Sequence, residues 1–275
     1  MVQINQINDS RIFQIAGQSI FLLVGILFLG WHTELPSFAI SIFSCYLFQS
    51  WAIQYLGLQD SLSLRSSLIT SLGLCLLLRV NHPLLMVTAA ALAIGQKFIF
   101  RWRGYHLWNP ANFAIAILVA FSNEAWVSPG QWGHFILLPL LILGIGTLVL
   151  RQAQRWDTAW FYMFTLASLS FFRFVFYQGW EVEVWWHQFN QGTIWLYALF
   201  MITDPMTSPQ HAVARRVWAV LLGVLVFYVQ HLWFIPTAAV WVLFFMTPWV
   251  PLINATLKST QWHWVSNRNF KSNTI

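Results

Sequence analysis

Long apolar runs separated by short polar segments follow one another along almost the whole chain. Residues 12–31 and 37–56 are each 20 residues long, the length that an α-helix needs to cross the hydrocarbon core of a bilayer. The sequence therefore predicts an all-α polytopic membrane protein with about ten transmembrane helices. The other expected spans are 64–78, 83–100, 112–121, 135–150, 158–176, 193–202, 213–229 and 233–252.

The composition agrees with a membrane protein. Only 8% of the residues are charged and 58% are hydrophobic, whereas about a quarter of the residues of a soluble domain are charged. The net charge of +6 is better explained by membrane topology than by nucleic-acid binding, so we expect a lipid bilayer as partner and no nucleic acid. Cys45 and Cys75 lie in apolar runs and are typical of small buried hydrophobic residues.

The basic residues predict the orientation. With ten spans and a cytoplasmic N-terminus, 12 of the 14 Lys and Arg residues fall on the cytoplasmic side, and only Arg79 and Arg173 fall outside. Cytoplasmic loops of membrane proteins carry such an excess. We therefore expect one transmembrane domain over residues 11–253, cytoplasmic tails at 1–10 and 254–275, and a location in the cell inner (plasma) membrane.

Two of the expected spans are short and are broken at an Asn-Pro and an Asp-Pro pair. Asn109-Pro110 precedes one of them, and Asp204-Pro205 follows the other. Asn and Asp cap helix N-termini, and Pro is favoured at the first helical position. We expect a helix to begin after each pair, with Ser208-Pro209 as a further start signal. Non-helical backbone at membrane depth must line a protein cavity, so the two pairs predict a binding site.

Charge and helix geometry indicate the chemistry of that site. Helix N-termini favour anions, and basic residues flank both predicted starts. The broader basic funnel would also contain Arg101, His211, Arg215 and Arg216, although positive-inside topology alone explains single arginines. The residues that we expect to bind a cofactor are Lys97, Arg103, His106, Asn109, Pro110, Asn112, Thr203, Asp204, Pro205, Thr207 and Ser208.

These same residues carry a family resemblance. The stretch from Gly95 to Phe100, followed by Gly104 and by Trp108-Asn109-Pro110-Ala111, and the stretch Phe200 to Ser208, resemble two motifs of the membrane flavin subunits of ion-pumping redox complexes. Those subunits are the D subunit of Rnf complexes and the B subunit of the sodium-translocating NADH:quinone reductase. Trp126 to Gly133 resembles a stand-alone, Rnf-D-like bacterial branch. The resemblance implies electron transport, a flavin such as FMN or riboflavin, and other subunits of a redox complex as partners.

One departure from the family concerns the covalent flavin. Members that carry covalent FMN attach it to the Thr of a Ser-Gly-Ala-Thr motif in the outer loop after the Asn-Pro-Ala span. The corresponding loop here, residues 122–133, contains no Thr. Gln191-Gly192-Thr193 lies in a later loop and lacks the Ala. We therefore expect a non-covalent flavin or a similar anionic cofactor, and no covalent one.

Two other functions remain open from the sequence. A protein of this fold could transport a small molecule without redox chemistry, or it could be a membrane assembly factor. No Ser/His/Asp triad, Walker loop, GxGxxG turn or metal-ligand spacing is present in the sequence, so the chain would at most be a subunit of a membrane oxidoreductase.

Overall fold

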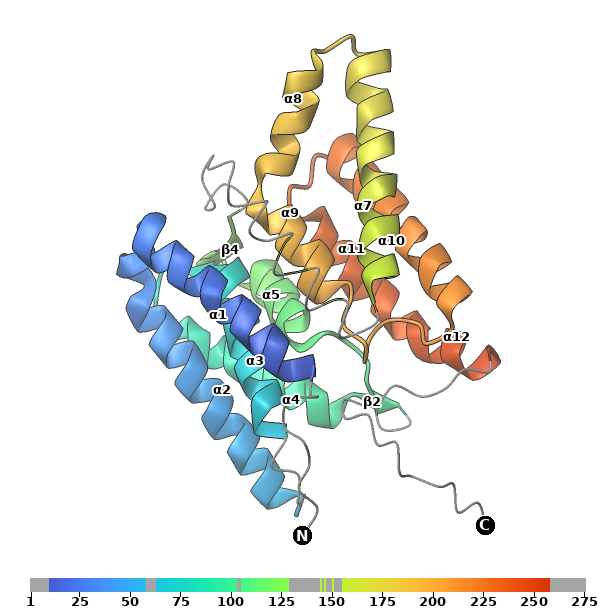
Figure 1. The fold of residues 1–275 in the computed structure, drawn as a ribbon. Coiled ribbons are helices and arrows are strands. Elements are labelled where there is room, and N and C mark those ends of the chain that lie inside the picture. Colours follow the sequence, from blue (N-terminus) through green and yellow to red (C-terminus); the bar gives the residue numbers. More distant parts are fainter. Residues whose placement is uncertain are drawn as a thin grey trace.

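The structure is a computed structural model, and it describes residues 10–57, 63–102, 105–128, 144, 146, 150 and 155–257. Helices account for most of these residues (Figure 1). The first half of the chain forms α1 (Ser10–Phe28), α2 (Leu35–Tyr55), α3 (Ser63–Leu77), α4 (Leu85–Ile99) and α5 (Pro110–Phe121). In this half α2 packs against α3 and α4, α1 packs against α3, and α4 packs against α5.

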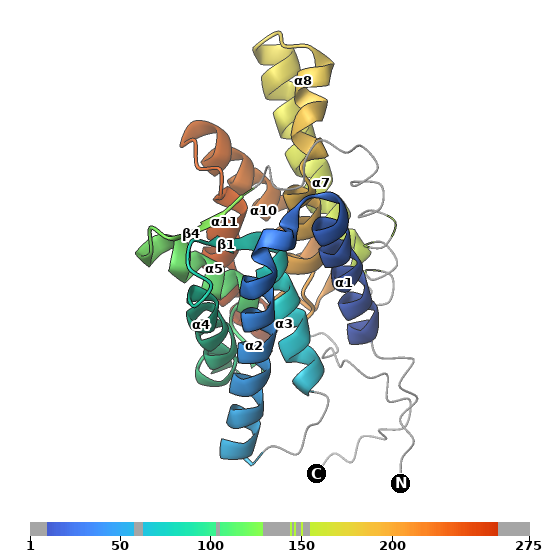
Figure 2. The ribbon, with the colours of Figure 1, turned by 90° about the vertical axis from the view of Figure 1, so that its left-hand side faces the viewer.

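The second half of the described chain is also helical. Its elements are α7 (Trp156–Phe171), η4 (Phe172–Tyr177), α8 (Val182–His187), η5 (Gln188–Asn190), α9 (Gly192–Leu196), η6 (Tyr197–Met201), α10 (Ala212–Leu232), α11 (Ala238–Met246), η7 (Thr247–Trp249) and α12 (Val250–Thr256). The elements η4 and η6 are π-helices. The two halves lie side by side in Figure 1, and Figure 2 looks onto the first half, with α1, α2 and α3 toward the viewer. The helix α5 joins the halves by packing against α11.

Two short antiparallel strand pairs lie at opposite ends of α5. At one end, β1 (Leu78–Val80) pairs with β4 (Ala125–Val127), with Arg79 opposite Trp126. At the other, β2 (Arg101–Trp102) pairs with β3 (Tyr105–His106). We call these the β4 end and the β2 end (Figure 1). The sequence predicted a connection between the spans 64–78 and 83–100 here, but not a strand.

The turn at the β4 end depends on a glycine and an arginine. Gly30 has a left-handed backbone (φ 75°), which glycine adopts without steric cost, and it leads from α1 into η2 (Trp31–Glu34). The Trp31 ring folds back onto Gly25, where an added Cβ would lie 2.1 Å from a ring atom. The guanidinium carbon of Arg79 lies 4.5 Å from the centroid of the Trp31 ring. A buried charge is thus held by a cation–π contact.

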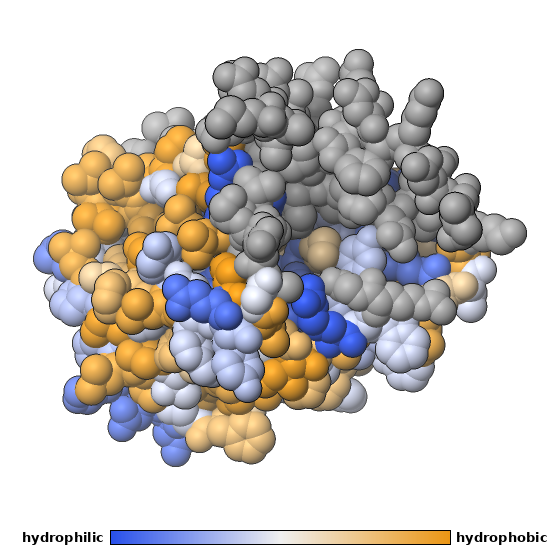
Figure 3. Space-filling view, turned by 90° about the horizontal axis from the view of Figure 1, so that it is seen from below, coloured by the Kyte–Doolittle hydropathy of each residue, from blue (hydrophilic) through white to orange (hydrophobic). Residues whose placement is uncertain are grey.

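The helices confirm the α-helical membrane class. Within the described residues, four helices are long and apolar enough to cross a membrane: Arg11–Phe28, Trp156–Tyr177, Ala212–Leu232 and Ala238–Thr256. Four shorter apolar helices accompany them at Leu64–Leu77, Leu85–Ile99, Pro110–Phe121 and Gly192–Met201. The total of ten spans stays a prediction, and the expected span at 135–150 lies almost wholly outside the described residues. Figure 3 shows hydrophobic side chains over much of the β2 end, interrupted by hydrophilic patches.

Candidate functional site

Asn109 caps α5 as the sequence predicts. Its Oδ1 accepts a hydrogen bond from the backbone N–H of Asn112 at 3.1 Å, and Pro110 is the first residue of the helix. The Asn109 backbone is extended (φ −60°, ψ 125°), as expected of an N-cap residue. The start of α5 is therefore fixed by its own sequence.

Asp204 does not begin a helix, which corrects the prediction made for the Asp-Pro pair. Its Oδ1 accepts from the backbone N–H of Met206 at 3.0 Å, so the carboxylate closes a turn. The next helix, α10, begins at Ala212, after both Asp204-Pro205 and Ser208-Pro209. This side-chain bond to the residue two positions ahead offers the backbone an alternative to helix.

The two Pro-containing segments meet through their capping residues. Asn109 Nδ2 donates to Asp204 Oδ2 at 3.1 Å. One turn into α5, Asn112 accepts at Oδ1 from the Tyr197 hydroxyl and donates from Nδ2 to the Val240 carbonyl at 3.2 Å. Asn109 and Asn112 thereby connect α5 with the segment that follows η6, with η6 itself and with α11.

A narrow pocket opens beside this pair, and we call it the Asp204 pocket. Its polar lining residues come from α1, α3 and the two Pro-containing segments: Gln14, Gln18, Ser66, Thr70, His106, Asn109 and Asp204. Gln18 is 3% exposed, and its Oε1 has no hydrogen-bond partner within the part of the chain that the structure describes. A buried acceptor without a donor is costly, so this atom is suited to a ligand.

The sequence reasoning missed the four residues of this pocket that lie on α1 and α3. Gln14 and Gln18 are four residues apart on α1, and Ser66 and Thr70 are four residues apart on α3. Residues at this spacing share one face of a helix. Two polar pairs at the same spacing in apolar runs were the signal that could have found them.

Lys97 lies behind the pocket. It is 6% exposed, and its Nζ donates to Ser66 Oγ at 3.1 Å, to the Ser66 carbonyl at 3.2 Å and to Gln49 Oε1 at 3.5 Å. None of these acceptors carries a charge. A buried ammonium whose partners among the described residues are all neutral adds a positive potential to the Asp204 pocket.

His106 stands between the Asp204 pocket and a second pocket at the β2 end, which Tyr105, Thr207, Gln210 and Asn254 also line. Its Nδ1 lies 2.8 Å from the Trp108 carbonyl. Because a carbonyl only accepts, Nδ1 carries the proton and Nε2 of the neutral ring is an acceptor. Burial lowers the pKa of His106 below its ordinary value, and the Asp204 carboxylate opposes that shift.

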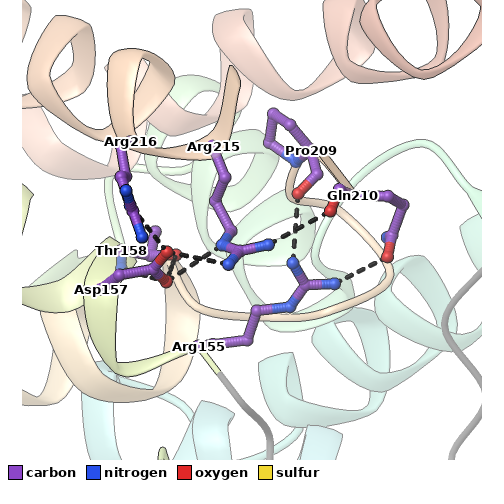
Figure 4. Close-up of polar contacts among 7 residues, drawn as sticks. All are labelled: Arg155, Asp157, Thr158, Pro209, Gln210, Arg215 and Arg216. Carbon is purple, nitrogen blue, oxygen red and sulfur yellow. Dashed lines mark hydrogen bonds and ion pairs between the residues drawn. The ribbon is translucent and has the colours of Figure 1, made fainter. Parts of the chain in front are cut away.

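Arg215 and Arg216 are directed to a carboxylate that the sequence reasoning did not single out (Figure 4). Asp157 accepts from Arg215 Nε at 3.0 Å, from Arg215 Nη2 at 2.8 Å and from Arg216 Nε at 3.4 Å. The expected basic funnel therefore has these two side chains engaged with Asp157, where they join α7 to α10. A two-pronged Arg–carboxylate contact is among the stronger pairings in proteins.

Arg155 and Gln210 hold the chain that follows Asp204. Arg155 donates from Nη1 to the Pro209 carbonyl at 3.1 Å and from Nη2 to Gln210 Oε1 at 2.7 Å (Figure 4). Gln210 Nε2 donates back to the Pro205 carbonyl at 2.7 Å. These contacts hold the segment from Pro205 to Gln210 at both of its ends. The position of this segment also fixes the direction of the neighbouring Asp204 carboxylate.

The remaining predicted residues lie in different surroundings. Thr203 donates to the Leu199 carbonyl at 2.6 Å and is 4% exposed, and Thr207 lines the second pocket. Ser208 is fully buried, and its hydroxyl has no hydrogen-bond partner among the described residues. Arg103 lies outside the described residues.

Comparison with known proteins identifies the family. The sequence profile described as "NQR2, RnfD, RnfE family" matches residues 121–262, which is just over half of the chain. The chain belongs to this family. The matched range of the NQR2, RnfD, RnfE family contains Tyr197, Asp204 and the Asp157 cluster, whereas Asn109 lies before it. No match to a curated protein was found.

Proposed function

We propose that the protein is a membrane electron-transport protein that binds a flavin-type cofactor, riboflavin or FMN, non-covalently at the Asp204 pocket. Membership of the NQR2, RnfD, RnfE family supports the electron-transport part. The observation that carries the site is the unsatisfied Gln18 Oε1 in a pocket lined by Asn109 and Asp204. A bound flavin would supply the redox chemistry.

The polar groups of the pocket fit the pyrimidine edge of a flavin ring, which alternates carbonyl acceptors with an N–H donor. Gln18 Oε1 is an open acceptor, and the Ser66 and Thr70 hydroxyls and the Gln14 amide line the same space. The pocket is narrow, so only this edge of the ring would enter it. Lys97 behind Ser66 favours a ligand that gains negative charge on reduction.

Substitution of Gln18 tests this site. Gln18→Leu keeps a similar volume and removes the open acceptor, and it should weaken riboflavin binding by about tenfold, as expected for one or two hydrogen bonds. Gln54, on α2, does not line the Asp204 pocket, so Gln54→Leu is the matched control. Riboflavin fluorescence quenching on the purified protein measures both. Equal affinity in wild type and Gln18→Leu would reject the site.

Transport of a small solute is the second candidate. A separate pocket at the β4 end is lined by Leu77 and Tyr197. Leu77 follows Gly73 of the Asp204 pocket by four residues, and Tyr197 precedes Met201 of the same pocket by four residues. On α3 this spacing corresponds to about 6 Å, or one helical turn. Tyr197→Phe removes the hydroxyl contact of this pocket residue to Asn112. Faster solute entry into proteoliposomes for this variant would favour transport, and an unchanged rate would count against it.

We propose that the cell inner membrane is the location, with both termini cytoplasmic, and that partner redox subunits deliver the electrons. The 12-to-2 charge distribution motivates the orientation. A Cys placed at Glu124 or Glu183 should react with an impermeant thiol reagent added outside intact cells, and one at Gln210 should not. Labelling of the Cys at Gln210 but not of those at Glu124 and Glu183 would show that the orientation is the opposite of the proposed one. Mild purification that recovers the protein without redox subunits would refute the partner proposal.

A further inference from the structure

The pocket at the β4 end has chemistry different from that of the Asp204 pocket, and we call it the Tyr162 pocket. It is lined by residues of α3, β4, α7, α9, η6, α10 and α11. Most of its wall is aliphatic, with Leu166, Val226 and Val240 as examples. Its polar members are amides and hydroxyls, and none of the described residues that line it is charged. The Asp204 pocket, by contrast, contains a carboxylate and a histidine.

Tyr162 gives this pocket an open hydrogen-bonding group. Its side chain is 1% exposed, and it lines the pocket. Among the described residues its hydroxyl has no partner, whereas the neighbouring Tyr197 hydroxyl donates to Asn112 Oδ1. Both tyrosines line the same pocket. Buried tyrosine hydroxyls usually find a partner, so an unpartnered one in a pocket indicates a ligand.

We propose that the Tyr162 pocket is a binding site for a small uncharged molecule that accepts a hydrogen bond from the Tyr162 hydroxyl. The absence of charge from the lining side chains decides the class, because an ion placed among aliphatic groups loses its hydration without a compensating partner. The aliphatic wall accepts a short apolar body. A short amide or alcohol has both features. This site does not depend on flavin binding at the Asp204 pocket.

Thr237 and Gln230 extend the polar part of the site. Thr237 Oγ1 accepts from Trp241 Nε1 at 3.2 Å, so its own proton remains available as a second donor. Gln230 lies near the end of α10 and also lines the pocket. Tyr162 lies on α7, Gln230 lies on α10, and Thr237 is the N-cap residue of α11, so the donors come from three different helices. Such convergent polar groups in an apolar pocket are typical of small-molecule sites.

Thiol modification with acetamide as probe tests the proposal on the purified full-length protein. Ala239→Cys places a thiol on the wall of the pocket, in a background with Cys45→Ser and Cys75→Ser. Each rate of modification is divided by the rate at an exposed Gln178→Cys control. On this scale the uncharged methyl methanethiosulfonate should react at least tenfold faster than its trimethylammonium or sulfonate analogue. Acetamide should slow the modification saturably. Ile194→Cys, another residue of the pocket wall, repeats the measurement if Ala239→Cys does not fold.

The hydroxyl is tested by one further substitution. Tyr162→Phe should weaken acetamide protection by about threefold to tenfold, the factor expected for one hydrogen bond. Tyr228→Phe, on the exposed side of α10, is the matched control and should leave protection unchanged. Protection by sodium ions instead of acetamide, modification only by the charged reagents, no saturable protection, or equal protection in Tyr162→Phe would each overturn the proposal.

Discussion

Asn109 and Asp204, 95 residues apart in the chain, are joined by a hydrogen bond in which Asn109 Nδ2 donates to Asp204 Oδ2 at 3.1 Å. Each residue also holds its own backbone, since Asn109 caps α5 and Asp204 closes the turn at Met206. The orientation of both side chains is therefore determined: Asn109 must present its amide nitrogen and Asp204 an acceptor. The ligand that we propose for the Asp204 pocket would bind beside a polar pair that the two local folds have already fixed.

This arrangement predicts the effect of Asp204→Asn. The new amide would either place a donor against the donor of Asn109 or lose the bond from Met206, so stability should fall by about 1–3 kcal/mol. Adding Asn109→Asp restores a donor–acceptor pair with the cap retained, because Asp and Asn cap about equally well. The double variant should therefore recover the thermal midpoint of the wild type. A midpoint for Asp204→Asn equal to that of the wild type would disprove the pairing.

Thr203 is expected to maintain the π-helix that precedes Asp204. In η6 the backbone N–H of Ile202 bonds to the Tyr197 carbonyl, five residues back, at 3.1 Å. The Thr203 hydroxyl bonds to the Leu199 carbonyl at 2.6 Å. Thr203→Val keeps the shape, removes this donor and should cost about 1 kcal/mol, whereas Thr203→Ser should retain it. π-Helices often occur at functional sites, so the affinity for riboflavin should be lower in Thr203→Val than in the wild type and should be close to that of the wild type in Thr203→Ser. Equal affinity in both would leave Thr203 without a role at the site.

The sequence predicted the Asn109 cap and the membrane class, but it did not predict the Asp204 turn. Asn-Pro and Asp-Pro give the same local signal for a helix start. What separates them is a tertiary contact: Asp204 Oδ2 meets Asn109 from a distant segment, and Arg155 and Gln210 hold the following residues in a turn. The pair Gln14 and Gln18 could be seen in the sequence, but its partners Ser66 and Thr70 are known only once α3 is placed beside α1.

Asp157 should be more important for stability than its position at the start of α7 suggests. It is 5% exposed and pairs with Arg215 and Arg216. Asp157→Asn leaves the buried Arg215 without a counter-charge, which should cost about 3–5 kcal/mol and lower the thermal midpoint. Glu183→Gln, at an exposed position on α8, controls for loss of a carboxylate and should have little effect. Equal midpoints for the two variants would contradict this role.

His106 should make stability depend on pH. Its pKa in the folded protein is lowered by burial, so the unfolded chain binds more protons as the pH falls below the ordinary value of about 6.5. Stability should therefore decrease on acidification through that range. His106→Gln can still donate to the Trp108 carbonyl and cannot be protonated, so its stability should vary less with pH. Denaturant unfolding at several pH values measures the difference. Parallel curves for the two proteins would show that His106 does not contribute.

Flavin content is the most direct test of the proposed function. The protein purified in mild detergent, after incubation with riboflavin or FMN and removal of the excess, should show the two absorption bands of an oxidised flavin in near-stoichiometric amount. Denaturation should release the flavin completely and leave no fluorescent band at the mass of the chain, because residues 122–133 contain no Thr. A native protein that retains neither riboflavin nor FMN, or a flavin that stays on the denatured chain, would contradict the account.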